Sequence, residues 1–226
     1  MIPPVTLTTA PDEGVWRLGR ASAPVVYNQV EPDTFGGSSA GRFSLFSYSM
    51  LYCASEPDGC FAEDLARYRV APKVRHLMSG SDTNGSEWMK TGDIPSSWRE
   101  ERILVRLIPS QRSRFLDVDS EETRDVLAAD LKDDLSAMGV EGSLTDEHIH
   151  GRDRRVARQI SAWAVAQRNE AGHQLVQGIT FRSSYGGRRC WAILGDTDLK
   201  EVERCPIRME DPALHAVARE YGLTIR

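Results

Sequence analysis

The sequence between Gly41 and Tyr68 brings together side chains that could bind phosphate and act on a glycosidic bond. This block contains Arg42, Tyr52 and Glu63. The guanidinium of an arginine is a planar set of donors that matches the oxygens of a phosphate group. A carboxylate can stabilise the positive charge that develops on a sugar ring when its glycosidic bond breaks. A tyrosine can stack on a flat ring or hydrogen-bond a hydroxyl group.

Each candidate also has an ordinary structural interpretation. Arg42 could hold the neighbouring glycine-rich loop, Tyr52 lies in an apolar run, and Glu63 on a helix would normally face solvent. Two further candidates lie outside the block. Arg17 could be a strand-surface residue and Ser183 a turn residue.

Several common catalytic and metal-binding patterns are missing from the sequence. It has no GxGxxG after a strand, no Walker lysine motif, no HExxH and no GxSxG, so dehydrogenases, P-loop enzymes, zinc proteases and α/β-hydrolases receive no support. His148 and His150 form no complete metal site by themselves, and we expect them in an exposed loop. The four cysteines lack zinc-ligand spacing, and Cys53 and Cys190 are expected to be packed thiols. We therefore expect no metal.

The composition is ordinary for a globular protein. The chain has 226 residues, of which 40% are hydrophobic and 27% charged. Its formal net charge of −5 disfavours direct nucleic-acid binding, because that binding depends on neutralising phosphates. No run approaches the roughly 18–20 apolar residues of a membrane helix, and the N-terminus lacks the pattern of a secretory signal. We expect a cytoplasmic protein that does not bind a membrane.

The apolar patterns predict the elements that must position the candidates. Short apolar or alternating runs predict strands at 15–18, 50–54, 103–108, 115–118, 176–181 and 189–194, and the alternating run at 42–46 can lead into a strand. Helical spacing of apolar residues predicts helices near 58–68, 120–138, 152–168 and 211–221. Because the predicted strands and helices do not alternate regularly along the chain, we expect an α+β fold, with a mixed or antiparallel β-sheet core flanked by helices.

The chain length fits a single domain. Residues 1–14 are rich in proline and threonine and are expected to form a loosely held N-terminal arm. Residues 15–226 are expected to form one domain that ends in a helix. Two polar stretches, 76–98 and 141–152, are predicted to be extended loops, and long loops in compact domains are usually functional or mobile.

Taken in order along the chain, the candidates resemble the RES family. Members of that family have an arginine in the opening strand, an arginine before a tyrosine-bearing strand, a helix with a glutamate, and a late segment that ends in serine. The matching segments are Val15-Trp16-Arg17, Gly41-Arg42-Phe43, Leu51-Tyr52-Cys53-Ala54, Phe61-Ala62-Glu63 and Gln177-Gly178-Ile179-Thr180-Phe181-Arg182-Ser183. The match runs from Trp16 to about Leu194, and this combination favours the functional interpretation of the five residues.

The resemblance implies an ADP-ribosyltransferase-like (RES) fold that binds NAD as a substrate and breaks its nicotinamide–ribose bond by hydrolysis or phosphorolysis. It implies catalytic roles for Glu63, Arg42 and Tyr52. The NAD-binding residues would be Arg17, Arg42, Tyr52 and Ser183. Arg17 and Arg42 would hold the pyrophosphate, and Glu63 would stabilise the charge on the ribose. Nicotinamide leaves as a neutral base, so the reaction requires no strong general acid.

The resemblance also implies partners. Many family members are toxins of bacterial toxin–antitoxin pairs, held inactive by an antitoxin with an Xre-type DNA-binding domain, and a homodimer is a further family-level expectation. Two other functions stay open. The chain could be a protein ADP-ribosyltransferase, which would use NAD to modify a protein. It could instead be a non-catalytic module that binds NAD, a nucleotide or a protein.

Overall fold

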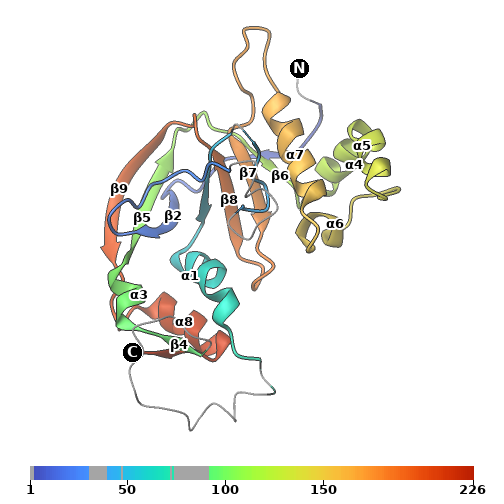
Figure 1. The fold of residues 1–226 in the computed structure, drawn as a ribbon. Coiled ribbons are helices and arrows are strands. Elements are labelled where there is room, and N and C mark those ends of the chain that lie inside the picture. The colour runs from blue at the N-terminus through green and yellow to red at the C-terminus, as the bar shows by residue number, and fades with distance from the viewer. Residues whose placement is uncertain (1–2, 31–39, 47, 72, 74–91) are drawn as a thin grey trace.

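A computed structural model describes residues 3–30, 40–46, 48–71, 73 and 92–226, and these residues form a curved eight-stranded sheet with helices around it (Figure 1). The strand order in this sheet is β1-β6-β7-β8-β3-β2-β5-β9. Its strands are β1 (Leu7–Thr8), β2 (Val15–Arg20), β3 (Met50–Ala54), β5 (Arg102–Pro109), β6 (Phe115–Asp117), β7 (Gly178–Arg182), β8 (Arg189–Leu194) and β9 (Leu199–Pro206). A separate two-stranded sheet joins β4 (Asp93–Ile94) to β10 (Thr224–Ile225) in parallel.

The large sheet is mixed. Strands β6 and β7 run parallel, whereas the other neighbouring strands are antiparallel. The prediction of an α+β fold with a mixed or antiparallel sheet core flanked by helices is therefore confirmed. The segment before Val15, expected as a loosely held arm, contributes β1 to this sheet, where it pairs with β6.

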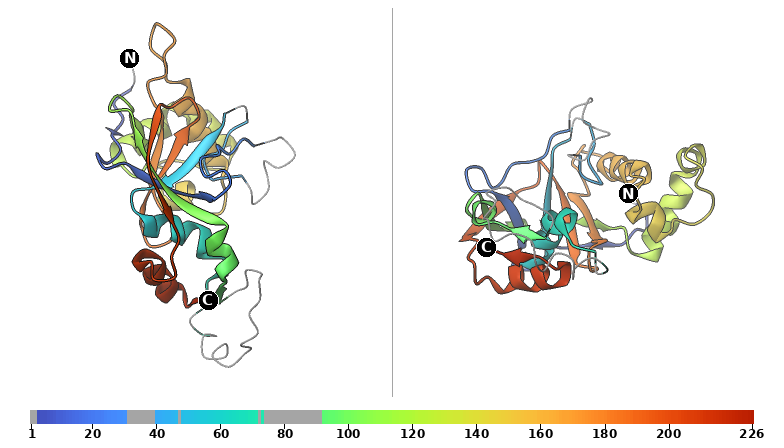
Figure 2. Two further views of the ribbon diagram at one scale, coloured as in Figure 1. Left: turned by 90° about the vertical axis from the view of Figure 1, so that its left-hand side faces the viewer. Right: turned by 60° about the horizontal axis from the view of Figure 1, so that its bottom comes forward.

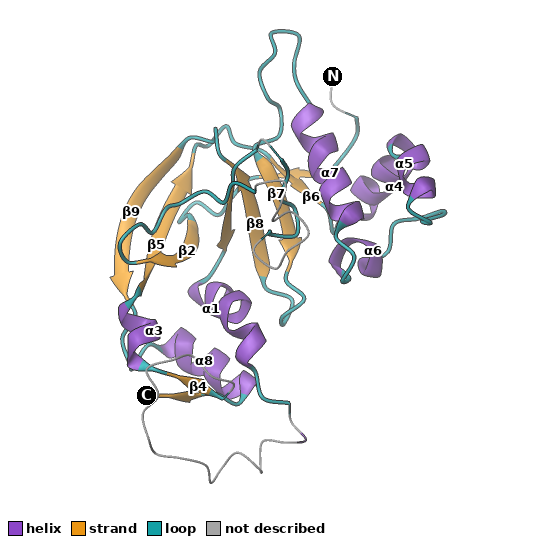
Figure 3. Ribbon diagram, viewed as in Figure 1, coloured by secondary structure: helices purple, strands orange, loops and turns teal. Residues whose placement is uncertain are grey.

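The helices form two groups on the sheet, as Figures 2 and 3 show from several sides. They are α1 (Pro57–Leu65), α3 (Ser96–Glu100), α4 (Glu121–Asp130), α5 (Lys132–Ala137), α6 (Asp146–His150), α7 (Arg155–Ala166) and α8 (Pro212–Tyr221). A short 3-10 helix, η2 (Ala66–Tyr68), continues α1. Helices α1 and α8 pack together below the centre of the sheet, and α4 to α7 gather at its β6–β7 end (Figure 1).

Local sequence signals explain the end of the chain. Helix α8 begins after Asp211, whose carboxylate accepts hydrogen bonds from the amides of Ala213 and Leu214, and Pro212 takes the first helical position. The helix ends at Gly222, which adopts a φ of 67° in the left-handed region. These signals set both ends of α8, the helix that packs against α1.

Strand β8 lies between two cores because both of its faces are apolar. Cys190, Ala192 and Leu194 contribute to the larger core under the helices, whereas Trp191 and Ile193 contribute to a smaller core on the opposite face. A strand buried on both faces has a continuous apolar sequence, and this one reads RCWAIL.

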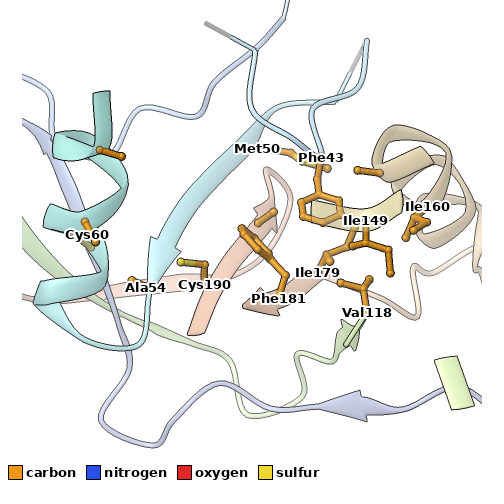
Figure 4. Close-up of a cluster of buried hydrophobic side chains, with 14 of the residues drawn as sticks. Phe43, Met50, Ala54, Cys60, Val118, Ile149, Ile160, Ile179, Phe181 and Cys190 are labelled. Atoms are coloured by element: carbon orange, nitrogen blue, oxygen red, sulfur yellow. The ribbon is translucent and has the colours of Figure 1, made fainter. Parts of the chain in front are cut away.

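The larger core also fixes the segment that follows residue 40. Phe43 is fully buried, and its ring lies 4.9 Å from that of Phe181 on β7, between centroids. Figure 4 shows both rings beside Ile149 of α6 and Ile179 of β7. Burying a side chain of this size contributes about 1.5–3 kcal/mol, so Phe43 anchors the adjacent Arg42.

Residues 42–46, which were expected to lead into a strand, form turns before β3, and the Phe43 amide and the Ser44 hydroxyl bond to a tyrosine side chain. Three sequence predictions differ from the structure. The predicted helix at 120–138 is divided into α4 and α5 at Leu131. The predicted loop at 141–152 contains α6. Strand β9 was not predicted, because its sequence, LKEVERCP, is dominated by charges.

The predicted loop at 76–98 lies largely outside the described residues, since residues 76–91 are not described. Its described end contains β4 and the start of α3. Trp98 on α3 is buried against Phe61, with 6.3 Å between ring centroids. Among the described residues, no helix has the length and apolar character needed to cross a membrane.

Candidate functional site

The large sheet opens between β2 and β3. These two strands pair only at Trp16 and Ala54, whereas β2 pairs with β5 along its whole length. Beyond that single pair, Nη1 of Arg17 donates a hydrogen bond of 2.9 Å to the carbonyl oxygen of Tyr52. The Arg17 side chain therefore bridges the opening where the strands diverge.

A cleft of about 1000 Å³ lies at this opening. Its volume is at the upper end of the roughly 300–1,000 Å³ that ligand sites usually enclose. The arginines that line it are Arg17, Arg20, Arg42, Arg67, Arg154 and Arg182. Among the described residues, the carboxylates that line it are Glu63 and Asp64, and Asp64 is already bonded to Trp98. The cleft is thus basic although the whole chain is acidic, and it suits an anionic ligand.

Four of the five sequence candidates line this cleft, namely Arg17, Arg42, Tyr52 and Glu63. Ser183 does not belong to the lining. Its side chain lies behind the carboxylate of Glu63 and donates a hydrogen bond to it. The structure therefore brings all five residues to one place, although they come from segments far apart in the sequence.

Arg17 has an unused donor. Its Nη1 bonds to the Tyr52 carbonyl, but its Nε is buried and has no hydrogen-bond partner among the described residues. A buried donor without a partner costs about 1–3 kcal/mol. A ligand oxygen in the cleft is one group that could satisfy it.

Arg42 is held by backbone carbonyls at the end of α6. Its Nη1 donates hydrogen bonds of 2.6 Å to the carbonyl of Gly151 and 3.3 Å to that of Ile149, at the end of α6. Burial lowers the pKa of Arg42, and the nearby charge of Arg154 lowers it further. The guanidinium is thus fixed by backbone carbonyls rather than neutralised by them.

Tyr52 organises the segment that carries Arg42. Its hydroxyl accepts a hydrogen bond of 3.1 Å from the Phe43 amide and lies 3.1 Å from the Ser44 hydroxyl. Gly41 permits this contact, since a Cβ there would lie 2.2 Å from the tyrosine oxygen. Burial raises the pKa of Tyr52 to about 12, so the phenol is neutral at ordinary pH. The Tyr52 hydroxyl therefore holds the segment that carries Arg42, and Tyr52 also lines the cleft.

Helix α1 places Glu63 over the cleft. The helix packs closely on β3, because a Cβ at Gly59 would come within 2.7 Å of the Ala54 side chain. The Cys60 thiol donates to the Trp16 carbonyl over 3.0 Å, and this contact ties α1 to β2 as well. Glu63 faces away from the buried side of the helix, and its side chain is accessible from the cleft.

Ser183 orients the Glu63 carboxylate. The serine hydroxyl donates a hydrogen bond of 2.5 Å to Oε1 of Glu63 and accepts one of 2.9 Å from the Tyr185 amide. Ser183 is only 4% exposed, which leaves little room for it to reach a ligand. A direct contact from Ser183 to NAD, which the family resemblance implies, is therefore not favoured by this geometry.

Arg188 holds the turn that contains Ser183. Its Nε donates to Asp58 on α1 over 2.8 Å, and its Nη2 donates to Glu220 on α8 over 2.7 Å. Its Nη1 donates to the Tyr185 carbonyl over 2.8 Å. The Arg188 side chain is only 16% exposed and joins this turn to both helices.

The surroundings of Glu63 change the pKa of its carboxyl group. Displacement of water by the protein around it raises the pKa of Glu63 above the ordinary value of 4.5. The hydrogen bond from Ser183 and the charge of Arg42 oppose that increase without cancelling it. A carboxylate with a raised pKa in a basic cleft is typical of a functional site.

Two features of the site were not predicted. Arg154, at the start of α7, lines the cleft and donates to the Ala40 carbonyl. Asp119 accepts a hydrogen bond of 2.7 Å from the Arg182 amide, next to Ser183, and lies 2.8 Å from Nε2 of His150 on α6. This carboxylate therefore links the strand before Ser183 to the helix end that holds Arg42.

His148 and His150 lie in helix α6, and Cys53 and Cys190 are buried in the sheet. Nδ1 of His148 accepts from the Thr145 amide in a capping box at the start of α6, so the two histidines are not in an exposed loop. Cys53 and Cys190 are buried, as predicted, and burial raises the pKa of both thiols. Within the described ranges, no group of three or more His, Cys, Asp or Glu side chains is arranged to hold a metal ion.

Comparisons with known proteins agree with this architecture. The fold is similar to a chain in the crystal structure of the M. tuberculosis MbcT–MbcA toxin–antitoxin complex, at a TM-score of 0.50 and 15% sequence identity, over 96% of this chain and 93% of that one. The search of curated proteins finds no match. The family model described as RES domain matches residues 15–215, which include all five candidates. The chain therefore belongs to the RES-domain family.

Proposed function

We propose that this protein is an enzyme that binds NAD as its substrate and breaks the bond between nicotinamide and ribose. One observation carries the proposal. The Glu63 carboxylate, oriented by Ser183, faces a cleft whose other charged lining is mostly arginine. NAD combines the two groups that such a site would recognise, since it has a diphosphate for the arginines and a glycosidic bond for the carboxylate.

Glu63 would act on the ribose. When the glycosidic bond breaks, its electron pair leaves with nicotinamide, which becomes a neutral base, and positive charge develops on the sugar. The carboxylate would stabilise this charge and orient the nucleophile that forms the new bond to the ribose carbon. With water as the nucleophile, one proton is released to solvent. The departure of a neutral base requires no general acid, and the described lining contains no histidine.

The other candidates would bind the substrate or position the side chains that act on it. Arg17 would use its unpartnered Nε, and Arg42 its carbonyl-anchored guanidinium, on the phosphate oxygens. Tyr52 would contact the substrate through its ring and hold the Arg42 segment through its hydroxyl. Ser183 would be a positioning residue for Glu63.

We also propose that the protein is the toxin of a toxin–antitoxin pair, with an Xre-type antitoxin as its partner. This rests on the RES-domain family and on the similarity of the fold to a chain of a toxin–antitoxin complex. Induced expression in a bacterial host should deplete NAD and stop growth, and the Glu63→Gln variant should do neither. Arrested growth with normal NAD levels would contradict NAD cleavage as the cause.

The reaction can be tested with NAD labelled in its adenosine half. Hydrolysis gives labelled ADP-ribose, phosphorolysis gives a labelled ADP-ribose phosphate only when phosphate is present, and transfer leaves the label on a protein of an added cell lysate. Each result identifies one form of the proposed chemistry. Labelled NAD that stays intact with and without phosphate and lysate would contradict the proposal.

A further inference from the structure

On one side of the cleft, two arginines from distant segments each donate hydrogen bonds to the segment that carries the other. Arg42 donates to the carbonyls of Ile149 and Gly151, just before α7. Arg154, at the start of α7, donates in return to the carbonyl of Ala40, two residues before Arg42. Because each side chain reaches the segment that carries the other, the two guanidinium groups lie close together, and both line the cleft.

Among the described residues, this pair of arginines forms no salt bridge with a carboxylate. Over the described part of the chain, no carboxylate oxygen comes within 4.0 Å of either guanidinium, and both guanidinium groups donate to backbone carbonyls. Other arginines of the fold do have such partners, for example Arg188 with Asp58 and Glu220. The burial of Arg42 and the charge of Arg154 both lower the pKa of Arg42, and the charge of Glu63 only partly opposes them.

Two like charges held together in a partly buried place destabilise a protein unless an anion binds between them. Backbone carbonyls fix the direction of both guanidinium groups without neutralising them, so donors on both side chains remain for a ligand. A phosphate group offers several oxygens and one or two negative charges, and it matches paired guanidinium donors.

We infer that Arg42 and Arg154 together form a phosphate-binding site on the α7 side of the cleft. The inference rests on the proposed function for its ligand, which is either the diphosphate of the dinucleotide substrate or free phosphate used as the nucleophile. The geometry favours the diphosphate, because two arginines can each bind one of its phosphoryl groups. Arg154 is then a substrate-binding residue that the sequence did not reveal.

The test measures binding without catalysis. Isothermal titration with ADP, with inorganic phosphate and with adenosine compares the wild-type protein with Arg154→Gln, a change that keeps a donor for the Ala40 carbonyl. We expect ADP affinity to fall about tenfold or more, as for the loss of one charge-assisted hydrogen bond, while any adenosine affinity stays within about twofold. Arg154→Lys should recover part of the loss, because lysine restores the charge without the planar set of donors.

The neighbouring residue provides a matched control. Arg155 is exposed and bonded to Asp153, so Arg155→Gln should leave ADP affinity unchanged. Circular dichroism and the melting temperature of each variant show whether the fold is intact. A loss of phosphate binding with unchanged ADP binding would assign the site to free phosphate. Unchanged binding of both ligands in Arg154→Gln, or no binding of either by the wild type, would overturn the inference.

The outcome separates this inference from the proposed reaction. If the wild type releases no nicotinamide yet its ADP binding depends on Arg154, the phosphate site stands and the proposed chemistry fails. If nicotinamide is released and Arg154→Gln changes neither ADP affinity nor the KM for NAD, the chemistry stands and the phosphate site fails.

Discussion

The Ser183 hydroxyl donates a hydrogen bond of 2.5 Å to Oε1 of Glu63, across 120 positions of the sequence. This contact joins the turn after β7 to helix α1 and fixes the orientation of the carboxylate in the cleft. The resemblance implies that Ser183 binds NAD directly. Because the Ser183 hydroxyl is almost fully buried and bonds to Glu63, its geometry instead favours a role in orienting that carboxylate.

The first prediction concerns the acidic side of the pH profile. The pKa of Glu63 lies above the ordinary value of 4.5, so its carboxylate becomes protonated at a higher pH than an exposed glutamate would. If the ionised form acts, kcat/KM for nicotinamide release falls as pH decreases, with a midpoint above 4.5. Ser183→Ala removes a hydrogen bond that lowers this pKa, so the midpoint should move to still higher pH.

Ser184→Ala is the matched control for that profile. The Ser184 hydroxyl donates to the His150 carbonyl over 3.3 Å and does not contact Glu63, so its removal should leave the midpoint in place. An unchanged midpoint in Ser183→Ala, with activity retained, would show that the serine does not act on the Glu63 carboxylate.

A second prediction concerns Asp119 and stability. Burial alone would raise the pKa of Asp119, but the hydrogen bond and charge of His150 lower it below 3.8. A lowered pKa stabilises the fold above the unfolded-state value, and this contribution disappears as pH falls through the folded-state value. Asp119→Asn should therefore reduce the free energy of unfolding at pH 7 by about 2 kcal/mol or more, and by less in acid.

Urea denaturation at neutral and acidic pH measures this difference. Asp153→Asn is the control, because its pair with Arg155 is exposed to solvent, and exposed pairs contribute little to stability. An Asp119→Asn protein as stable as the wild type at pH 7 would refute a stabilising role for the link between α6 and β7.

A third prediction separates the hydroxyl of Tyr52 from its ring. Tyr52→Phe leaves the Phe43 amide without its acceptor, which should cost about 1–3 kcal/mol of stability. The segment that carries Arg42 should then be less well fixed, so KM for NAD should rise more than kcat falls. Tyr48→Phe, at an exposed tyrosine, should change neither value. A normal KM in a destabilised Tyr52→Phe protein would limit the hydroxyl to a role in folding.

The sequence predicted the parts of the fold that local patterns determine. Strands β3 and β8 were found because buried central strands are continuously apolar, as in MLYCA and RCWAIL. Strand β9 was missed because an edge strand with one solvated face can be highly charged. Helix α6 was missed because it has only five residues and its sequence, DEHIH, is mostly polar.

The site was predictable where a residue type and a motif coincide. Arg42 and Glu63 were found from a compact block of sequence, and the structure places both in the cleft. Arg154 was not found, because it is one of several arginines in a polar run, and its position depends on a contact with Ala40, 114 residues away. No local signal reports a contact of that kind, and the same is true of the bond from Ser183 to Glu63.

The most direct measurement of the central claim is the rate of nicotinamide release from saturating NAD by the purified protein and by Glu63→Gln. We expect steady release by the wild type and a loss of about 100-fold or more in the variant, with NAD affinity changed only slightly. Glu56→Gln, at an exposed glutamate just before α1, should behave as the wild type. Equal release by the wild type and Glu63→Gln, or none by either, would contradict the account.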